Sequence, residues 1–378
     1  MGAKVAVLRE RKPGEARAAL TPETARKLIT QGCSVTVESG AGLGAFIPDE
    51  EYAAAGAAVA PDAATALAAA DLILSVRGLE PDVVGGLKPG ATVVAMLNPY
   101  GEREAVQALA GQGATAFAME FVPRITRAQA MDVLSSQANL AGYRAVIEAA
   151  AAYTKGFPMM MTAAGTVAAA KVFVMGAGVA GLQAIATARR LGAVVTATDV
   201  RPAAKEQVES LGAKFVAVQD EEFAAAETAG GYAKAMSPEY QAKQAALTAE
   251  HVRKQDVVIT TALIPGRPAP RLLSAEHLGS MRPGSVIVDM AVEQGGNVEG
   301  SRPDELVMTD GGVRVLGFTN LTARIAADAT ALYARNLLSF TGLLLKNGEL
   351  APDPDDEILK AALVSQNGLV VHSALTGT

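Results

Sequence analysis

The chain has 378 residues, with 33 Lys and Arg against 39 Asp and Glu, and a formal net charge of −6 at pH 7. This acidic balance argues against nucleic acid or an anionic membrane surface as the main partner, and the length predicts two domains. The 37 glycines, the absence of Trp and the low aromatic content are typical of an α/β protein with tight backbone turns.

The first third of the chain alternates short apolar segments with Ala-rich segments of helical character. A helix is expected to begin at Thr21-Pro22, because Thr is a good N-cap and Pro suits the first helical position. This alternation predicts a parallel sheet with helices on its faces. The predicted buried strands are Lys4–Leu8, Ser34–Glu38, Asp71–Val76, Ala91–Leu97 and Ala114–Glu120.

Two long helices are expected to divide the chain. One covers Met131 to about Tyr153, where Gly142 is the main helix breaker, and the other covers Asn320–Lys346. A second α/β region lies between them. We therefore predict a discontinuous first domain, residues 1–132 plus 330–378, and a second domain, residues 133–329, with the linking helices at its ends.

The most informative segment is Lys171–Arg201, "KVFVMGAGVAGLQAIATARRLGAVVTATDVR". An apolar strand is followed by Gly176-Ala-Gly178-Val-Ala-Gly181, a helix and a second strand, the pattern of a Rossmann dinucleotide-binding unit. The glycines allow a tight turn, approach of a pyrophosphate and close helix–strand packing. The alternative is a glycine-rich turn that binds nothing. A second cluster, Gly40–Gly44, is spaced differently and is predicted to be only a turn.

Asp199 ends the second strand of this unit. A carboxylate there accepts hydrogen bonds from the adenosine ribose hydroxyls and repels a 2′-phosphate, which favours NAD over NADP. Arg201 weakens this argument, because arginine accommodates a 2′-phosphate; its alternative interpretation is a solvated surface residue.

Two later loops follow predicted strands at the sheet edge where ligands bind in such folds. They are Thr260–Pro270 and Asp289–Asn297, and both cofactor contact and simple turn formation remain open. Ala226–Tyr240, with paired glycines and Tyr232, is predicted to be either a mobile flap over the nucleotide or an ordinary surface loop.

The stretch Pro123–Arg144, "PRITRAQAMDVLSSQANLAGYR", concentrates polar side chains among apolar ones but contains no His, Cys or Lys. It therefore lacks a ready acid, base or nucleophile. Arg124 and Asp132 have a structural alternative, as members of an ion pair and a helix cap.

Cysteine and histidine usage points to a reducing, cytoplasmic compartment without a metal site. Cys33 is the single cysteine, so an intrachain disulfide is excluded. The apolar region Gly156–Ala188 is long enough to resemble a membrane span, but Lys171 interrupts it and the nucleotide-binding unit explains its apolarity. Metal-ligand spacing is absent among the three histidines, His251, His277 and His372.

Five segments together resemble the NAD(H)-binding component of proton-translocating nicotinamide nucleotide transhydrogenase, over essentially the whole chain. They are "RITRAQAMDVLSSQANLAGYRAV", "FPMMMTAAGTV", "GAGVAGLQAIATARRLGAVVTATDVR", "AETAGGYAKAM" and "TTALIPGRPAP". The resemblance implies two doubly wound Rossmann-like domains with a nucleotide cleft between them, and a homodimer. It also implies separate partners: an NADP(H)-binding subunit and a membrane subunit that conducts protons, through which this chain associates peripherally with the inner membrane.

Residue roles follow from the same resemblance. Arg124, Gln129 and Asp132 match the loop that positions the nicotinamide ring, and Ser135 matches a residue that contacts its side of NAD. Tyr232 matches the tyrosine of the mobile loop. The predicted cofactor-binding residues are Gln129, Ser135, Gly176, Gly178, Val179, Ala180, Gly181, Asp199, Val200, Arg201, Thr261, Ala262 and Leu263.

Hydride exchange between two nicotinamides explains why the polar stretch lacks a proton donor. The rings must be held face to face without water, whereas reduction of an imino or keto acid also needs a proton. Alanine dehydrogenase, which has the same fold, is the alternative: Arg17 agrees with its carboxylate-binding arginine. However, Ser75 and Asn98 stand where its catalytic Lys and His are typical. A non-catalytic NAD-sensing module is the third possibility.

Overall fold

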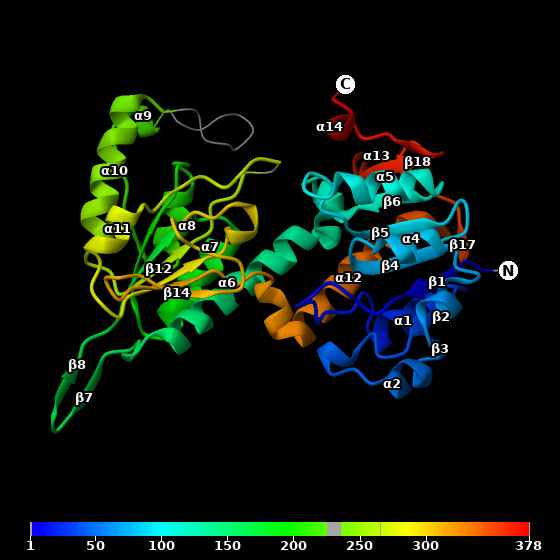
Figure 1. The fold of residues 1–378 in the computed structure, drawn as a ribbon, viewed down its shortest axis with the longest axis horizontal. Coiled ribbons are helices and arrows are strands. Elements are labelled where there is room, and N and C mark those ends of the chain that lie inside the picture. The colour runs from blue at the N-terminus through cyan, green and yellow to red at the C-terminus, as the bar shows by residue number, and fades with distance from the viewer. Residues whose placement is uncertain (1, 225–235, 265, 378) are drawn as a thin grey trace. The chain divides into compact units, whose positions relative to one another are not determined.

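The computed structural model describes residues 2–224, 236–264 and 266–377. These residues form two compact units, Met1–Gln137 with Thr322–Thr378, and Ala138–Leu321. Both are α/β units with a doubly wound sheet, as predicted (Figure 1). The division between the units falls at 137/138 and 321/322, and the first division lies inside the long helix α6 (Val133–Ala152).

The first unit is built on an eight-stranded sheet with the order β19-β18-β6-β5-β4-β1-β2-β3. The six strands from β3 to β6 are parallel, and β18 and β19 extend the sheet antiparallel. The strands are β1 (Lys4–Val7), β2 (Ser34–Glu38), β3 (Ala58–Ala60), β4 (Leu72–Arg77), β5 (Thr92–Met96), β6 (Thr115–Ala118), β18 (Leu363–Gln366) and β19 (Leu369–Val370). The sequence therefore located the five predicted strands correctly.

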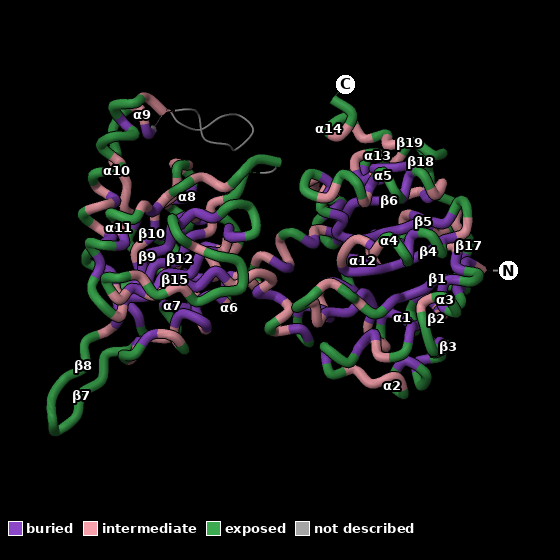
Figure 2. The backbone as a smooth tube through the Cα atoms, viewed as in Figure 1, coloured by how far each residue is buried: buried purple, intermediate pink, exposed green. Residues whose placement is uncertain are grey.

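Helices cover both faces of this sheet. On one face, α1 and α12 bury Leu28, Tyr333 and Phe340 against β1, β4 and β5. Helices α3, α4 and α5 pack on the other face, and the strands between the two helical layers are largely buried (Figure 2). The helices and helical turns are α1 (Pro22–Thr30), η1 (Leu43–Ala45), α2 (Asp49–Ala54), α3 (Ala63–Leu67), α4 (Pro81–Gly85), α5 (Arg103–Gly111), η2 (Met119–Phe121), η3 (Thr126–Met131), α12 (Ala326–Leu344), α13 (Glu357–Ala362) and α14 (Ser373–Thr376). A short hairpin, β16 (Leu345–Lys346) and β17 (Glu349–Leu350), follows α12.

Local sequence signals explain several of these boundaries. Thr21 caps α1 as predicted, with Thr24 completing a capping box. The Gly40–Gly44 cluster forms a turn and η1. The predicted helix Asn320–Lys346 is shorter than expected, because Asn320 has a left-handed backbone (φ 45°) and η5 (Leu321–Ile325) precedes α12.

The second unit contains a seven-stranded sheet, β11-β10-β9-β12-β13-β15-β14, parallel except for β14. Its strands are β9 (Lys171–Met175), β10 (Val194–Thr198), β11 (Lys214–Phe215), β12 (Val257–Thr260), β13 (Val286–Asp289), β14 (Leu306–Met308) and β15 (Arg314–Leu316). Its helices are α7 (Val179–Arg190), α8 (Ala204–Ser210), α9 (Glu221–Ala224), α10 (Pro238–Val252), α11 (Ala275–Ser280) and η4 (Val292–Gln294). An exposed hairpin, β7 (Met160–Thr162) and β8 (Gly165–Val167), extends from this unit.

The second sheet is also buried on both faces. Val172, Val174 and Ile259 contact α6 and α7, while Phe173 and Val258 face α10 and α11. Continuous apolar strands are typical of parallel sheets covered by helices. No helix among residues 2–224, 236–264 and 266–377 combines the length and apolarity that crossing a membrane requires.

Candidate functional site: the glycine turn of the second unit

The turn between β9 and α7 packs backbone against backbone. Gly176 has φ +106°, which only glycine adopts readily, and a Cβ at Gly181 would lie 1.8 Å from the Gly176 carbonyl oxygen. Gly142 of α6 is equally constrained, since its Cβ would lie 2.1 Å from the Ala180 oxygen. These glycines bring α6, β9 and the first turn of α7 closer together than any side chain would allow.

Gly178 differs from its neighbours because a Cβ there would meet no heavy atom within 4 Å among the described residues. It is the N-cap of the 12-residue α7, and within the described chain no side chain caps that end. The amides of the first turn, which includes Val179 and Ala180, therefore lie at an exposed helix end, at the positive end of the helix dipole. This cradle fits the pyrophosphate of a dinucleotide.

Asp199 follows β10 and closes the other side of this turn. Its Oδ2 accepts the Ala177 N–H at 2.7 Å, and its Oδ1 accepts the Arg201 N–H at 2.9 Å. The Arg201 side chain donates to both oxygens, from Nε at 2.9 Å and from Nη2 at 3.0 Å. Asp199 is thus held as an oriented carboxylate next to the glycine turn, while Val200 beside it is exposed.

The loop after β12 is fixed by a buried amide. The Thr261 hydroxyl donates to the Gly176 oxygen at 3.1 Å, which ties this loop to the glycine turn. Asn297 accepts the Ala262 N–H and donates to the Ala262 and Pro270 carbonyls, at 2.8–3.1 Å. Asp289 in turn accepts the Asn297 N–H, so the loop after β13 braces the loop after β12, whose Leu263 is exposed.

Arg124, Gln129, Asp132 and Ser135, predicted to hold the nicotinamide, lie in the first unit. Arg124 is exposed in the loop before η3, and Gln129 is exposed within η3. Asp132 caps α6: it accepts the Ser135 N–H at 2.8 Å and the Ser135 hydroxyl at 2.6 Å. Asp132 therefore forms the helix cap that was given above as its structural alternative. Its role in positioning the nicotinamide stays a prediction.

Side chains of α12 anchor this segment. Ser136 donates to Asn336 at 2.7 Å, and Asn336 donates to the Ala130 carbonyl at 2.8 Å. The predicted residues are thus divided between the two units, with the glycine turn, Asp199 and the Thr261–Leu263 loop in the second. Tyr232 lies outside the described residues.

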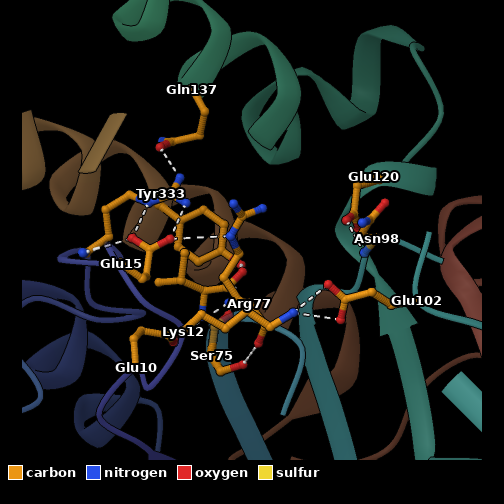
Figure 3. A network of polar contacts seen from close by, with 12 residues as sticks. Glu10, Lys12, Glu15, Ser75, Arg77, Asn98, Glu102, Glu120, Gln137 and Tyr333 are labelled. Carbon is orange, nitrogen blue, oxygen red and sulfur yellow. Dashed lines mark hydrogen bonds and ion pairs between the residues drawn. The ribbon is translucent and has the colours of Figure 1, made fainter. Parts of the chain in front are cut away.

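The first unit contains a buried polar network where β1 and β4 end (Figure 3). Arg17 and Glu15 form a two-pronged ion pair, Nε–Oε1 2.8 Å and Nη2–Oε2 2.7 Å, with side chains only 3% and 1% exposed. Gln137 accepts from Arg17 Nη1 at 2.8 Å, and Arg77 Nε lies 3.4 Å from Glu15. Desolvation lowers the pKa of Arg17, but the bonds to Glu15 outweigh it and raise the pKa above its ordinary value.

Glu10 occupies the carboxyl end of β4. Its carboxylate accepts the N–H groups of Val76 at 2.6 Å and Arg77 at 3.2 Å. Desolvation raises the pKa of Glu10 to about 7, with a further contribution from nearby Glu15. Tyr333 donates to the Ser75 carbonyl at 2.9 Å, and burial raises the pKa of its hydroxyl well above the usual range. Glu10 and Glu15 were not identified from the sequence, although the position of Glu10, shortly after the buried strand β1, was a visible signal.

Ser75 and Asn98 stand at the two positions where a catalytic Lys and His are expected from the sequence in an alanine dehydrogenase. The Ser75 hydroxyl, 2% exposed, donates to the Arg77 carbonyl, and the Asn98 N–H donates to Glu120 at 2.7 Å. Lys12, the lysine drawn in this network, is bound to Glu102 at 2.5 and 2.6 Å. Removal from solvent raises the pKa of Glu120. The residues labelled in Figure 3 include acids, Arg77 and Lys12, but no histidine.

Comparison with known proteins agrees with this architecture. The sequence model described as the N-terminal domain of alanine dehydrogenase/PNT matches residues 6–141, and that of the C-terminal domain matches residues 145–373. The chain is 52% identical over 381 residues to an NAD(P) transhydrogenase subunit alpha chain of Rhodospirillum rubrum, covering 99% of each chain. It is 31% identical to alanine dehydrogenase of Halomonas elongata, covering 98% of this chain and 95% of that one.

A solved structure shows the same pattern in three dimensions. The crystal structure of transhydrogenase from Sinorhizobium meliloti superimposes with a TM-score of 0.89 at 57% identity, covering 97% of this chain and all of that one. The chain therefore belongs to the alanine dehydrogenase/PNT family, and within it the chain is more similar to NAD(P) transhydrogenase alpha subunits than to the alanine dehydrogenase compared.

Proposed function

We propose that this chain is the NAD(H)-binding subunit of a proton-translocating transhydrogenase, which exchanges hydride with NADP(H) held by a partner subunit. The observation that carries the proposal is the second unit's glycine turn, where an open helix N-terminus and an oriented carboxylate stand together. The names of the transhydrogenase relatives support the reaction class. NAD(H) is favoured because Asp199 presents a carboxylate where a ribose or a 2′-phosphate would lie.

Each part of the site has a proposed task. The amides of Val179 and Ala180 bind the pyrophosphate, Asp199 binds the adenosine ribose, and the loop of Thr261, Ala262 and Leu263 holds the middle of the dinucleotide. Arg124, Gln129, Asp132 and Ser135 orient the nicotinamide and its carboxamide, with Tyr232 closing over it. The dinucleotide supplies the hydride chemistry, and the protein contributes position and exclusion of water.

The proposed assembly has three kinds of component. This chain forms a homodimer, an NADP(H)-binding subunit docks beside Arg124 and Gln129, and a membrane subunit couples the reaction to proton translocation. The chain is then a cytoplasmic component held at the inner membrane through its partners. The exposure of Arg124 and Gln129 supports the docking surface, because both side chains are accessible on the first unit.

Gly178→Ala tests the nucleotide site directly. The added methyl group meets open space in the protein, so the thermal unfolding midpoint is expected to stay unchanged. A pyrophosphate that approaches the backbone would collide with it, so NADH affinity should fall at least about tenfold, by calorimetric titration. Gly85→Ala is the matched control, since its Cβ also meets nothing within 4 Å. Unchanged NADH affinity in Gly178→Ala would contradict the proposed site.

The reaction is tested with the purified chain, NADH, NADP⁺ and a competent NADP(H)-binding partner. Hydride exchange only when the partner is present is the expected result. A parallel reaction contains NAD⁺ and L-alanine without the partner. NADH formation there would favour the alanine dehydrogenase alternative. Ser75 and Asn98, at the positions where that enzyme is expected to carry a Lys and a His, argue against this outcome. NADH binding without either reaction would favour the NAD-sensing module.

A further inference from the structure

The contact between Asp199 and Arg201 is more extensive than a surface ion pair requires. Four donors share the two oxygens of Asp199: the Ala177 and Arg201 backbone N–H groups and two nitrogens of the Arg201 side chain, all at 2.7–3.0 Å. A carboxylate has about four lone-pair directions, so these four donors use its full capacity to accept hydrogen bonds. The Asp199 side chain is 7% exposed and that of Arg201 35% exposed.

Two of these four donors are nitrogens of the Arg201 side chain, which is flexible. The two N–H groups are fixed, one by the glycine turn and the other by the bend after β10. A ribose hydroxyl that bonds to Asp199 must therefore take the place of at least one Arg201 nitrogen. Arg201 then remains within reach of the ribose, because its own backbone stays bound to Asp199.

A guanidinium beside the adenosine ribose is the group that binds a 2′-phosphate. Asp199 counters it in two ways: it neutralises the charge of Arg201, and its own charge repels a phosphate. We propose that Arg201 is a 2′-phosphate-binding residue held inactive by Asp199, so that the balance between these two side chains determines the dinucleotide specificity of this chain. The inference rests on the proposed nucleotide site and extends it to a second specificity-determining residue.

The test measures binding of NADH and NADPH by calorimetric titration, with 2′-AMP as a probe for the phosphate alone. Asp199→Asn retains an oxygen that can accept the Ala177 N–H, and Asp199→Ser is a smaller second variant, so the result does not depend on one substitution folding. Both variants should bind NADPH and 2′-AMP at least about tenfold more tightly than the unmodified chain, and NADH more weakly. The gain should decrease with salt, as expected for a charge–phosphate contact.

A double variant identifies Arg201 as the source of the gain. Asp199→Ser with Arg201→Ala should lose the gain in NADPH affinity, whereas Asp199→Ser with Arg190→Ala should keep it. Arg190 is an exposed arginine in the last turn of α7, so the two double variants carry the same net charge.

The outcomes separate the two proposals. If the unmodified chain binds NADH but neither Asp199 variant gains NADPH affinity, the inference about Arg201 is wrong and the proposed function stands. A gain that persists without Arg201 also overturns the inference. If the unmodified chain binds no dinucleotide, the proposed nucleotide site fails, and the inference fails with it.

Discussion

The two units wind their parallel sheets in the same way but use the equivalent point of the sheet differently. In each unit the strand order reverses beside the first strand, between β1 and β4 in one and between β9 and β12 in the other. Ligands of doubly wound proteins bind outside the carboxyl ends of the strands at this point. In the second unit this point holds the glycine turn, where a Cβ at Gly178 would meet no heavy atom within 4 Å among the described residues. In the first unit it holds the paired charges of Glu10, Glu15, Arg17 and Arg77, and a small pocket lined by Glu10, Ser75 and Arg77 remains beside them.

This difference shows that topology provides a place for a ligand but not the ligand site itself. The second unit combines an uncapped helix N-terminus with one carboxylate, which suits a phosphate and a sugar. The first unit satisfies its charges internally, so a buried arginine there already has a carboxylate from its own chain. Four substitutions test this contrast and the role of Asp132, beginning with the largest expected loss of stability.

Arg17→Leu should cause the largest effect, a loss of about 3–5 kcal/mol from the stability of the first unit, because Glu15 would remain buried without its main partner. Urea unfolding followed by circular dichroism measures this loss. Lys27→Ala breaks the exposed pair with Glu23 and should cost less than about 1 kcal/mol. Equal losses in the two variants would show that the network does not stabilise the first unit as proposed.

Gly181→Ala should destabilise the second unit by about 1–3 kcal/mol, because its methyl group collides with the Gly176 carbonyl. Thermal unfolding of the variant, compared with Gly178→Ala, measures the effect. The two alanines separate packing from ligand contact: the first should lower the unfolding midpoint and the second should not. If Gly178→Ala unfolds as early as Gly181→Ala, the turn around Gly178 is a packing element and not a cradle.

Glu10→Gln should flatten the pH dependence of stability in the first unit. The pKa of Glu10 is about 7 in the folded chain against 4.5 for an ordinary glutamate, so between these values the folded state binds more protons than the unfolded state. Stability therefore falls as pH rises from 4.5 to 7, by up to about 2–3 kcal/mol, and the amide removes this decrease. Urea unfolding at pH 5, 6, 7 and 8 tests it, with the exposed Glu51→Gln as control. Parallel pH profiles for the Glu10 variant and the unmodified chain would contradict the prediction.

Asp132→Ala should cost about 1 kcal/mol, the usual value of a helix N-cap. Asp132→Asn keeps an oxygen for the Ser135 N–H and should cost less. Hydride exchange with the NADP(H)-binding partner then decides between the two interpretations of Asp132. A slow Asp132→Asn variant of normal stability indicates that the carboxylate positions the nicotinamide, whereas a normal rate indicates that Asp132 only caps α6.

Short-range sequence patterns accounted for the strands and for the glycine turn. The apolar runs located β1, β2, β4, β5 and β6, and the glycine spacing with Asp199 located the turn between β9 and α7. The predicted start of α12 was too early, because hydrophobic periodicity carries no signal for the left-handed backbone at Asn320. The bonds from Asn297 to the Ala262 loop were equally invisible, since they join segments 35 residues apart.

What the sequence determined by itself is the set of elements with a local physical cause. Thr21 caps α1, Gly176 permits the left-handed turn, and apolar runs form strands buried on both faces. Only the tertiary structure decided which distant groups complete the charged networks: that Gln137 accepts from Arg17, that Glu10 lies at the end of β4, and that the Ala177 N–H donates to Asp199. Hydrogen bonds and ion pairs depend on distances of about 3 Å, and between residues far apart in the sequence those distances exist only after the sheets assemble.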